Sequence, residues 1–461
     1  PTLVTFKSTI AVSAVYSVPS SARAYETAPS SPTVLAPLSD QVASLLKIRA
    51  LVHRVTVVTA VRIWEVRDAS DRIALRLEET TWRPERSKQP APTMTTLALR
   101  AVKRFPDLPD RARALCRQAQ LAPVRTAPPT WAFLTAGLEP GRYSAKPHIP
   151  LDEKLDAREA VRLICRQLLA TMLQNEEGLR RGWDTEFLHD FRVAMRRTRV
   201  LIGQAKSVLP AEGLPAFRRD FKALGRMTGP LRDLDVHLLD EERYRSLLPG
   251  ILRPGLGSLF ARLEHRRQAA HDEVVDVLDS TEYRDLIRRW TAYLAPTAAP
   301  DRTRDGASGE PVRTFACRRI VRQHRRILSR GKKIDAATPA AALHRLRIEC
   351  KKLRYLLELF ADLFPPGEIK ALVSCLKQLQ DHLGEFNDLS VQQRRLRADL
   401  AALPAADPAA PAEAAAIGGL LAVLAPRQAV LRDAFAETFA AFARKSVTRR
   451  LHGLLSRTDG P

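Results

Sequence analysis

The 461-residue chain has little cysteine and no long apolar run, and both shortages narrow what it can be. Its five cysteines are odd in number, widely spaced and form no CxxC pair, which argues against a disulfide framework or a zinc site and fits a reducing cytosol. No run of 18 or more apolar residues occurs, so we expect no membrane-spanning segment. The N-terminal TIAVSAVYSV is short and interrupted by serine, which favours a strand over a signal peptide.

The motifs of common catalytic sites are also missing. The sequence contains no P-loop, HExxH, GxSxG or GxGxxG, and its basic stretches lack the carboxylate cluster that magnesium-assisted phosphoryl transfer needs. We therefore predict a binding protein with no catalytic residue, no metal site and no cofactor.

Positive charge is what the chain has in excess. Lys and Arg number 74 against 51 Asp and Glu, a formal net charge of +23, which predicts acidic partners such as nucleic acid, anionic lipid or polyphosphate. Residues 1–150 contribute +10 of this charge and residues 151–461 contribute +13. Total charge therefore does not locate the site, and only its pattern can.

Two regions differ in periodicity. Residues 1–150 predict an α+β domain, with strands in RVTVVTAVRIWEV and RIALRLEETTW and a helix in PDRARALCRQAQL. A proline-rich boundary at 127–152 precedes an all-helical region that continues to residue 461. Within it, 294–311 predicts a linker, and the Ala/Pro tract 401–419 has too little bulk for a core and is expected to lie between helices.

An internal repeat is the most informative feature. LHDFRVAMRRTR (188–199) returns as LHRLRIECKKLR (343–354) at a shift of 155 residues, and one register holds over 49 residues. The same shift relates Lys222 to Lys377, Gly229 to Gly384 and Asp233 to Asp388. We predict repeats at about 151–293 and 312–461. Each would have a basic helix, a proline stop, a second helix with a lysine, a glycine turn, and an aspartate that caps a helix or tethers an arginine.

The basic helices carry their charge on one side. At 100° per residue His189, Arg192, Arg196 and Arg199 fall within an arc of about 80°, with an apolar face beside it. His344, Arg347, Lys351 and Arg354 repeat this stripe. A solvated face normally interleaves acids, yet neither stripe contains one. The pattern predicts anion binding, with two stripes that could face one shared groove. The neighbouring cations should keep His189 and His344 neutral, each able to donate one hydrogen bond to a phosphate oxygen.

The residues 151–460 resemble the CHAD domain, the conserved histidine α-helical domain, on LHDFRVAMRRTR, LHRLRIECKKLRY, FKALGRMTGPLRDLDV and LKQLQDHLGEFNDLSV. The resemblance implies two four-helix bundles related by a pseudo-twofold axis, a basic groove between them, and inorganic polyphosphate as ligand. Granule association in the cytoplasm is also implied. The expected polyphosphate-binding residues are His189, Arg192, Arg196, Arg197, Arg199, Lys222, His344, Arg347, Lys351, Lys352, Arg354 and Lys377, together with Arg318, Arg322, Arg325 and Lys332 of a further basic helix.

The same resemblance implies a CYTH domain in residues 1–150, a triphosphate-binding tunnel of strands. The family's ExExK motif supplies metal-binding glutamates, whereas the corresponding VTFKSTIAVS has no glutamate. We expect a degenerate CYTH-like domain without catalytic metal ligands. Two alternatives stay open: a nucleic-acid backbone binder, for which the stripes offer no stacking aromatic except nearby Tyr355, and a triphosphatase in the N-terminal domain.

Overall fold

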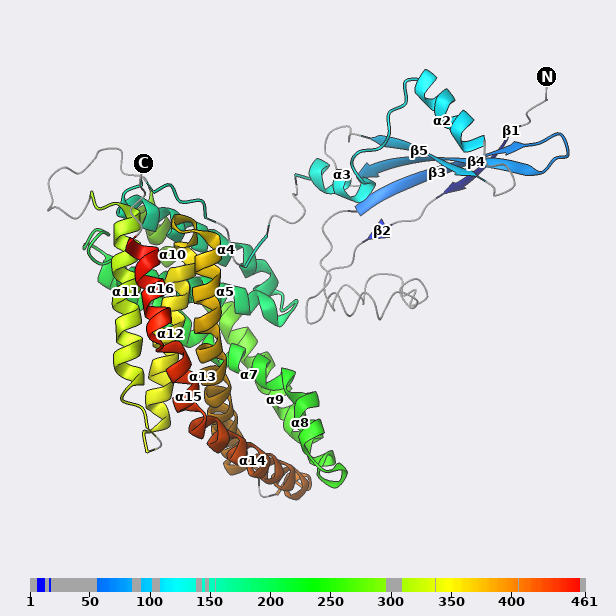
Figure 1. Ribbon diagram of the computed structural model, residues 1–461. Helices are drawn as coiled ribbons and strands as arrows, with labels where there is room; N and C mark the ends of the chain where they lie inside the picture. Colours follow the sequence, from blue (N-terminus) through cyan, green and yellow to red (C-terminus); the bar gives the residue numbers. More distant parts are fainter. Residues whose placement is uncertain are drawn as a thin grey trace. The chain divides into compact units, whose positions relative to one another are not determined.

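The computed structural model describes residues 6–12, 16–17, 56–84, 93–101, 108–137, 143–145, 149–153, 155–295, 309–335, 337–404 and 406–456. The chain divides into two compact units, Pro1–Ser144 and Ala145–Pro461, which are treated separately below. Figure 1 shows a sheet-containing unit and a helical unit. The division lies close to the predicted proline-rich boundary.

The N-terminal unit is built on one antiparallel sheet. Its strands are β1 (Phe6–Val12), β2 (Tyr16–Ser17), β3 (Thr56–Arg67), β4 (Ile73–Pro84) and β5 (Met94–Ala101), in the order β1-β3-β4-β5, with β2 also paired to β3. Helices α2 (Leu108–Gln118) and α3 (Pro128–Thr135) pack against it. The predicted strands and the first predicted helix are confirmed, because their alternating and 3.6-residue patterns match these elements.

Glutamates of this sheet form ion pairs with arginines on neighbouring strands. Arg76 lies 3.2 Å from Glu65, and Arg100 lies 2.8 Å from Glu78. Cross-strand pairs of opposite charge stabilise a sheet by directly facing one another. These carboxylates of β3 and β4 are therefore already matched by guanidinium groups.

The first half of the helical unit runs from α4 to α10. Its elements are α4 (Ala157–Arg180), α5 (Thr185–Gln204), α6 (Leu214–Met227), α7 (Gly229–Leu239), α8 (Glu241–Leu247), η2 (Gly250–Leu252), α9 (Pro254–Asp279) and α10 (Thr281–Leu294). Polar caps begin several of them: Asp156, Asp184 and Ser280 accept hydrogen bonds from backbone amides in the first turns of α4, α5 and α10.

The second half repeats this order. It comprises α11 (Val312–Gly331), α12 (Ala340–Leu359), η3 (Ala361–Leu363), α13 (Pro366–Ala401), α14 (Ala410–Asp433), α15 (Phe435–Phe442) and α16 (Lys445–Ser456). A shift of 155 residues carries both ends of α5 onto those of α12, so the repeat read from the sequence is also a repeat of helices. Most of the predicted linker, 296–308, lies outside the described residues.

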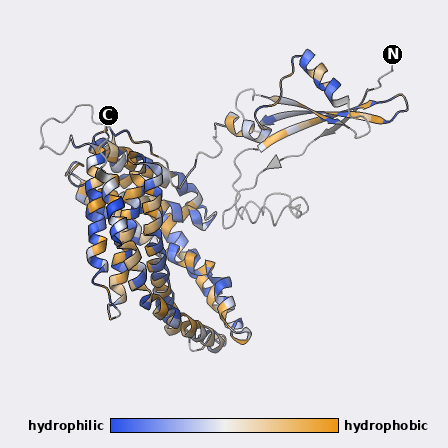
Figure 2. Cartoon of the chain, viewed as in Figure 1, coloured by the Kyte–Doolittle hydropathy of each residue, from blue (hydrophilic) through white to orange (hydrophobic). Residues whose placement is uncertain are grey.

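Equivalent helices of the two halves pack against each other. These pairs are α4 with α11, α5 with α12, and α9 with α14. One large core contains residues of both halves, including Phe191, Trp290, Phe315 and Phe360, and a second core joins α8, α9, α13 and α14. Figure 2 shows hydrophilic and hydrophobic residues alternating along the long helices, as expected of helices with one buried face.

The expectation for the Ala/Pro tract 401–419 is wrong, because most of it is helical. α14 begins at Ala410, and its Ile417 and Leu420 are fully buried. Small side chains are what this contact needs: a Cβ at Gly255 of α9 would lie 2.1 Å from the Ala412 carbonyl oxygen. The small residues of the tract allow the backbones of α9 and α14 to lie close together, where bulky side chains would not fit. Among the described helices, α14 alone is also long and apolar enough to cross a membrane, with a mean hydropathy of 1.6.

The predicted glycine turn occurs in one half only. In the first half α6 ends at Met227 and α7 begins at Gly229, with Pro230 in its first turn. In the second half Gly384 lies inside the continuous helix α13, so the turn predicted there is wrong. Proline cannot donate a helical hydrogen bond and clashes with the preceding turn, which breaks the helix, whereas the equivalent residue Glu385 lets it continue.

Candidate anion-binding groove

A groove of about 520 Å³ lies between α5 of the first half and α12 and α13 of the second. Its cationic wall consists of Arg196, Arg197, Arg243, Arg347, Lys351 and Arg354, with His189 at its edge. Figure 1 locates the helices that carry these residues. The two predicted stripes therefore contribute to one shared groove, since both α5 and α12 present basic residues to it.

Four carboxylates line the same groove, and the sequence pointed only to Asp388 among them. They are Glu358, Asp381, Glu385 and Asp388. Glu358 accepts hydrogen bonds from Arg197 (2.8 Å) and Arg354 (2.6 Å), while Asp388 lies 3.4 Å from Arg347. Asp388 is thus a tether for a stripe arginine, one of its two predicted roles. It does not cap a helix, because α13 continues through it.

Arg196 and Lys351 occupy equivalent positions of the two repeats and meet in this groove. Neither makes a hydrogen bond or an ion pair with any residue that the structure describes. Burial and the positive charges of Arg347 and Arg196 together lower the pKa of Lys351 to about 7, while Asp388 opposes the shift. The groove therefore concentrates cationic charge that its own carboxylates do not neutralise.

His189 is half-buried at the groove edge. Arg232 of α7 lies 2.9 Å from its Nδ1, and because a guanidinium can only donate, Nδ1 accepts. Burial lowers the pKa of His189, and the charge of Arg232 lowers it further, so both favour the neutral form. The proton then sits on Nε2, where it can be donated to an anion.

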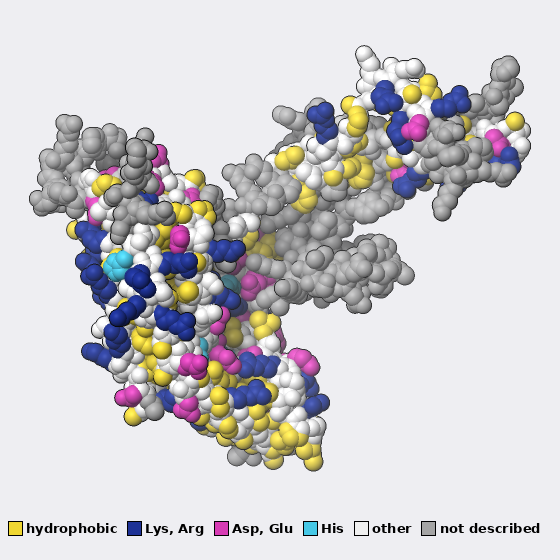
Figure 3. Space-filling model, viewed as in Figure 1, with side chains coloured by type: hydrophobic (Ala, Val, Ile, Leu, Met, Phe, Trp, Pro, Cys, Tyr) yellow, Lys and Arg dark blue, Asp and Glu magenta, His cyan; other side chains and the backbone are white. Residues whose placement is uncertain are grey.

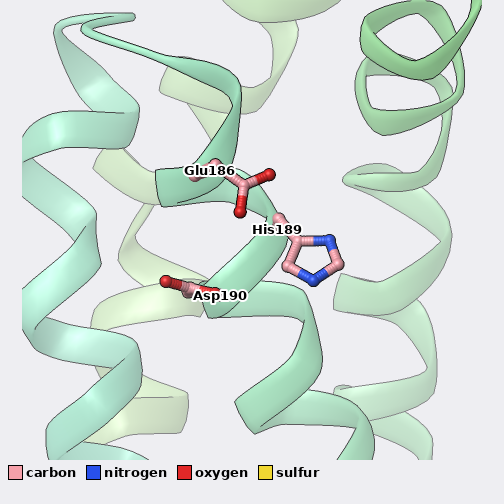
Figure 4. A group of neighbouring side chains, drawn as sticks. All are labelled: Glu186, His189 and Asp190. Atoms are coloured by element: carbon pink, nitrogen blue, oxygen red, sulfur yellow. The ribbon is translucent and has the colours of Figure 1, made fainter. Parts of the chain in front are cut away.

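Glu186, His189 and Asp190 lie close enough to consider a metal ion (Figure 4). The guanidinium of Arg232 already lies beside this group, 2.9 Å from His189 Nδ1 and 3.9 Å from Glu186. A fixed positive charge in contact with two of the three side chains opposes binding of a second cation. We assign no metal to the group.

The second histidine, His344, is exposed and stands outside the groove lining. Its Nδ1 lies 2.5 Å from Asn387 Oδ1, and the amide nitrogen of Asn387 in turn donates to Asp388 at 3.3 Å. With the amide oriented in this way, Nδ1 must donate. The Nδ1 atoms of the two histidines therefore play opposite parts, since that of His189 accepts a hydrogen bond and that of His344 donates one.

Several predicted residues hold the fold together. Arg192 donates to Gly225 O (3.0 Å) and Thr228 Oγ1 (2.5 Å) at the end of α6, and burial lowers its pKa to about 10. Arg199 is exposed, and its guanidinium lies beside Gly225, where burial lowers its pKa. Lys352 lies 3.0 Å from Glu349, away from the groove. Arg192 and Lys352 are therefore held by internal contacts.

The remaining predicted cations lie on other surfaces. Lys222 and Lys377 are exposed outside the groove lining. The basic helix α11 presents Arg318, Arg322, Arg325 and Lys332 to solvent, and Figure 3 shows Lys and Arg side chains gathered along it. Arg318 is matched by Glu310 at 2.5 Å. The sixteen predicted residues therefore divide between one groove, internal contacts and a separate basic surface.

Two residues of the candidate site were missed from the sequence. Arg232, which fixes the His189 tautomer, and Arg243, which lines the groove, come from α7 and α8. Arg232 lies in the motif GPLRDLDV, yet the repeat gave no reason to choose it, because the equivalent residue of the second half is Asn387. Arg243 lies on a short helix with no counterpart in the repeat pattern.

The chain belongs to the CHAD family, whose domain model matches residues 163–397. A solved structure, the CHAD domain from the plant Ricinus communis, is 31% identical and superposes with a TM-score of 0.54, covering 65% of this chain and 96% of that one. PptA from Streptomyces chartreusis is 16% identical with a TM-score of 0.48, covering 62% and 100%. Comparison with curated proteins gives no match.

Proposed function

We propose that this protein binds inorganic polyphosphate, without catalysis, in the groove between its two repeats. One observation carries the proposal. Arg196 and Lys351, equivalent cations of the two halves, both line the groove, and neither has a partner among the described residues. The proposal includes the pseudo-twofold pair of four-helix bundles that the family implies. It also includes a degenerate CYTH-like N-terminal domain, and association with polyphosphate granules in the cytoplasm.

The groove cations can bind a chain of phosphates because phosphate oxygens can replace their weak contacts with groove carboxylates. Arg347 lies 3.4 Å from Asp388, which is long for an ion pair. A phosphate oxygen can therefore replace this contact at a small cost in free energy. Arg196 and Lys351 lose no internal partner on binding. His189 adds a neutral donor. Because the charges stand on packed helices, little ordering is needed when the ligand binds, and release of condensed counterions favours long chains at low salt.

Nucleic acid is the main competing ligand, and the groove offers it little beyond charge. Base stacking needs an exposed aromatic ring. The groove's aromatic residue, Tyr355, is 7% exposed, and the guanidinium of Arg197 lies 5.6 Å from the centre of its ring. This ring is therefore covered, and discrimination in favour of a plain phosphate chain is expected.

The test is binding of long-chain polyphosphate, with tripolyphosphate and single-stranded DNA as competitors, at two salt concentrations. The groove variant is Arg196→Glu/Lys351→Glu, and its matched control is Arg322→Glu/Arg325→Glu on α11. Two charge reversals in the groove should weaken binding roughly 100-fold or more, and those on α11 only a few-fold. Thermal melting of both variants checks that the fold is kept.

Three results would count against the proposal. Equal loss in the α11 control would move the site to that surface, and equal competition by DNA would favour the nucleic-acid alternative. Magnesium-dependent release of phosphate from tripolyphosphate by the wild-type protein would contradict a purely binding role and favour the triphosphatase alternative.

A further inference from the structure

Lys351 differs from the other lysines of the helical unit in its surroundings. Arg347 and Arg354 lie on its own helix, Arg196 faces it from α5, and Asp388, Asp381 and Glu385 line the same groove from α13. The adjacent Lys352 is bound to Glu349 at 3.0 Å, whereas Lys351 has no such partner in the described part of the chain. It is a half-buried amine enclosed by guanidinium groups.

These surroundings favour the uncharged form of the Lys351 amine at neutral pH. Burial first, and then the charges of Arg347 and Arg196, lower the pKa of Lys351 to about 7. About half of such side chains are uncharged at pH 7, against roughly one in 3,000 for a lysine with the ordinary pKa of 10.5. An uncharged amine is a nucleophile, while an ammonium ion is not.

We propose that Lys351 is a self-modification site for acyl phosphates, small dianions whose phosphate the groove arginines hold while the amine attacks the acyl carbon. A bond forms between Nζ and the carbonyl carbon, and the carbon–oxygen bond to phosphate breaks. The amine proton leaves with inorganic phosphate. The products are an amide on Lys351 and hydrogen phosphate, so no oxidant, reductant or further reactant is required.

The arginines provide the selectivity for this class of reagent. Arg196 and Arg347 come from facing helices, and both have guanidinium donors suited to a tetrahedral phosphate. They would position the carbonyl beside Nζ and stabilise the charge that develops on the departing phosphate. A neutral acylating reagent has no group for them to hold, so it should show less preference for Lys351.

Acylation would replace a titratable amine with a neutral, larger amide inside the groove. The affinity for polyphosphate should then fall, and bound polyphosphate should shield Lys351 from the reagent. This consequence rests on the proposed function. The acylation itself does not, because it is measured on the protein alone.

The first experiment incubates the full chain with acetyl phosphate and, in parallel, with acetic anhydride, and measures acetylation of each lysine by peptide mass spectrometry. At pH 7 acetyl phosphate should modify Lys351 at least about tenfold faster than Lys222, Lys332 or Lys352, because those lysines lie outside the groove and its phosphate-holding arginines. The preference should be smaller with the anhydride. Equal rates at Lys351 and the exposed lysines, or an equal preference with both reagents, would overturn the proposal.

A second experiment separates phosphate holding from the protonation state. Arg196→Gln is compared with Arg322→Gln, a matched change on the exposed face of α11, at pH 9.5 where Lys351 is uncharged in every variant. Loss of Arg196 should slow the acetyl phosphate reaction at Lys351 about tenfold and leave the anhydride reaction unchanged, as expected for one lost charged hydrogen-bonding group. An unchanged acetyl phosphate rate in Arg196→Gln would overturn the proposal.

Discussion

Arginines at equivalent positions of the two repeats make different contacts in the helical unit. Arg192 donates to the backbone and to Thr228 where α6 ends, while its equivalent, Arg347, faces the groove and contacts Asp388. The cause lies in the next helix. Pro230 interrupts it and leaves the Gly225 carbonyl for Arg192, whereas α13 passes unbroken through the same position and satisfies its own carbonyls. A repeated motif therefore does not guarantee a repeated role.

The largest effect should come from the pair Arg197 and Lys352, which occupy equivalent positions. Arg197 is 5% exposed and binds Glu358 and the Ala145 carbonyl, so Arg197→Ala should lower the free energy of unfolding by about 3 kcal/mol, since it breaks a buried ion pair. Lys352→Ala should cost about 1 kcal/mol or less, because the Lys352 side chain is 29% exposed, against 6% for that of Arg197. Chemical denaturation measures both; equal losses would contradict this difference between the halves.

A second contrast sets Arg192 against Arg347. Arg192→Ala should destabilise the fold by about 2 kcal/mol, because the end of α6 loses a charged donor, and should leave polyphosphate affinity within a few-fold. Arg347→Ala should have the opposite profile, with affinity about tenfold weaker and little change in melting temperature. The two variants need both measurements. If Arg192→Ala weakened binding as much as Arg347→Ala, both stripes would reach the ligand.

The smallest effect should be a pH dependence of binding. A bound polyanion favours the charged form of Lys351, so binding takes up a proton where the free amine is neutral. Affinity should therefore fall a few-fold between about pH 6.5 and 8.5. Titration calorimetry in buffers of different ionisation enthalpy would detect the proton uptake. Lys351→Arg keeps its charge throughout, so retention of the full pH dependence in that variant would exclude Lys351 as its source.

The lowered pKa of Lys351 also makes the stability of the free protein depend on pH. Its pKa in the folded state, about 7, lies below the ordinary value of 10.5, so the unfolded chain binds more protons between these values. Stability should accordingly rise with pH across this window as far as this group determines it. Below pH 7 the folded protein carries the full cost of the buried ammonium.

Periodicity in the sequence was enough to predict the helices of the repeat and the side on which their charges lie. It could not show which cations would be matched, because Glu358 and the acids of α13 approach from one turn further along or from another helix. It also failed at α14, where close packing against Gly255 rewards small side chains that resemble a linker composition. Angles within one helix were predictable, and contacts between helices were not.

Equivalent helices of the two halves pack against each other within a single chain. In a homodimer every residue must serve both subunits, so an arginine beside one histidine would have to stand beside the other. Here the covalent link allows Arg232 to accompany His189 and Asn387 to accompany His344. The surroundings of the two histidines thereby differ chemically, although the helices that carry them share one pattern, and of the two only His189 lines the groove.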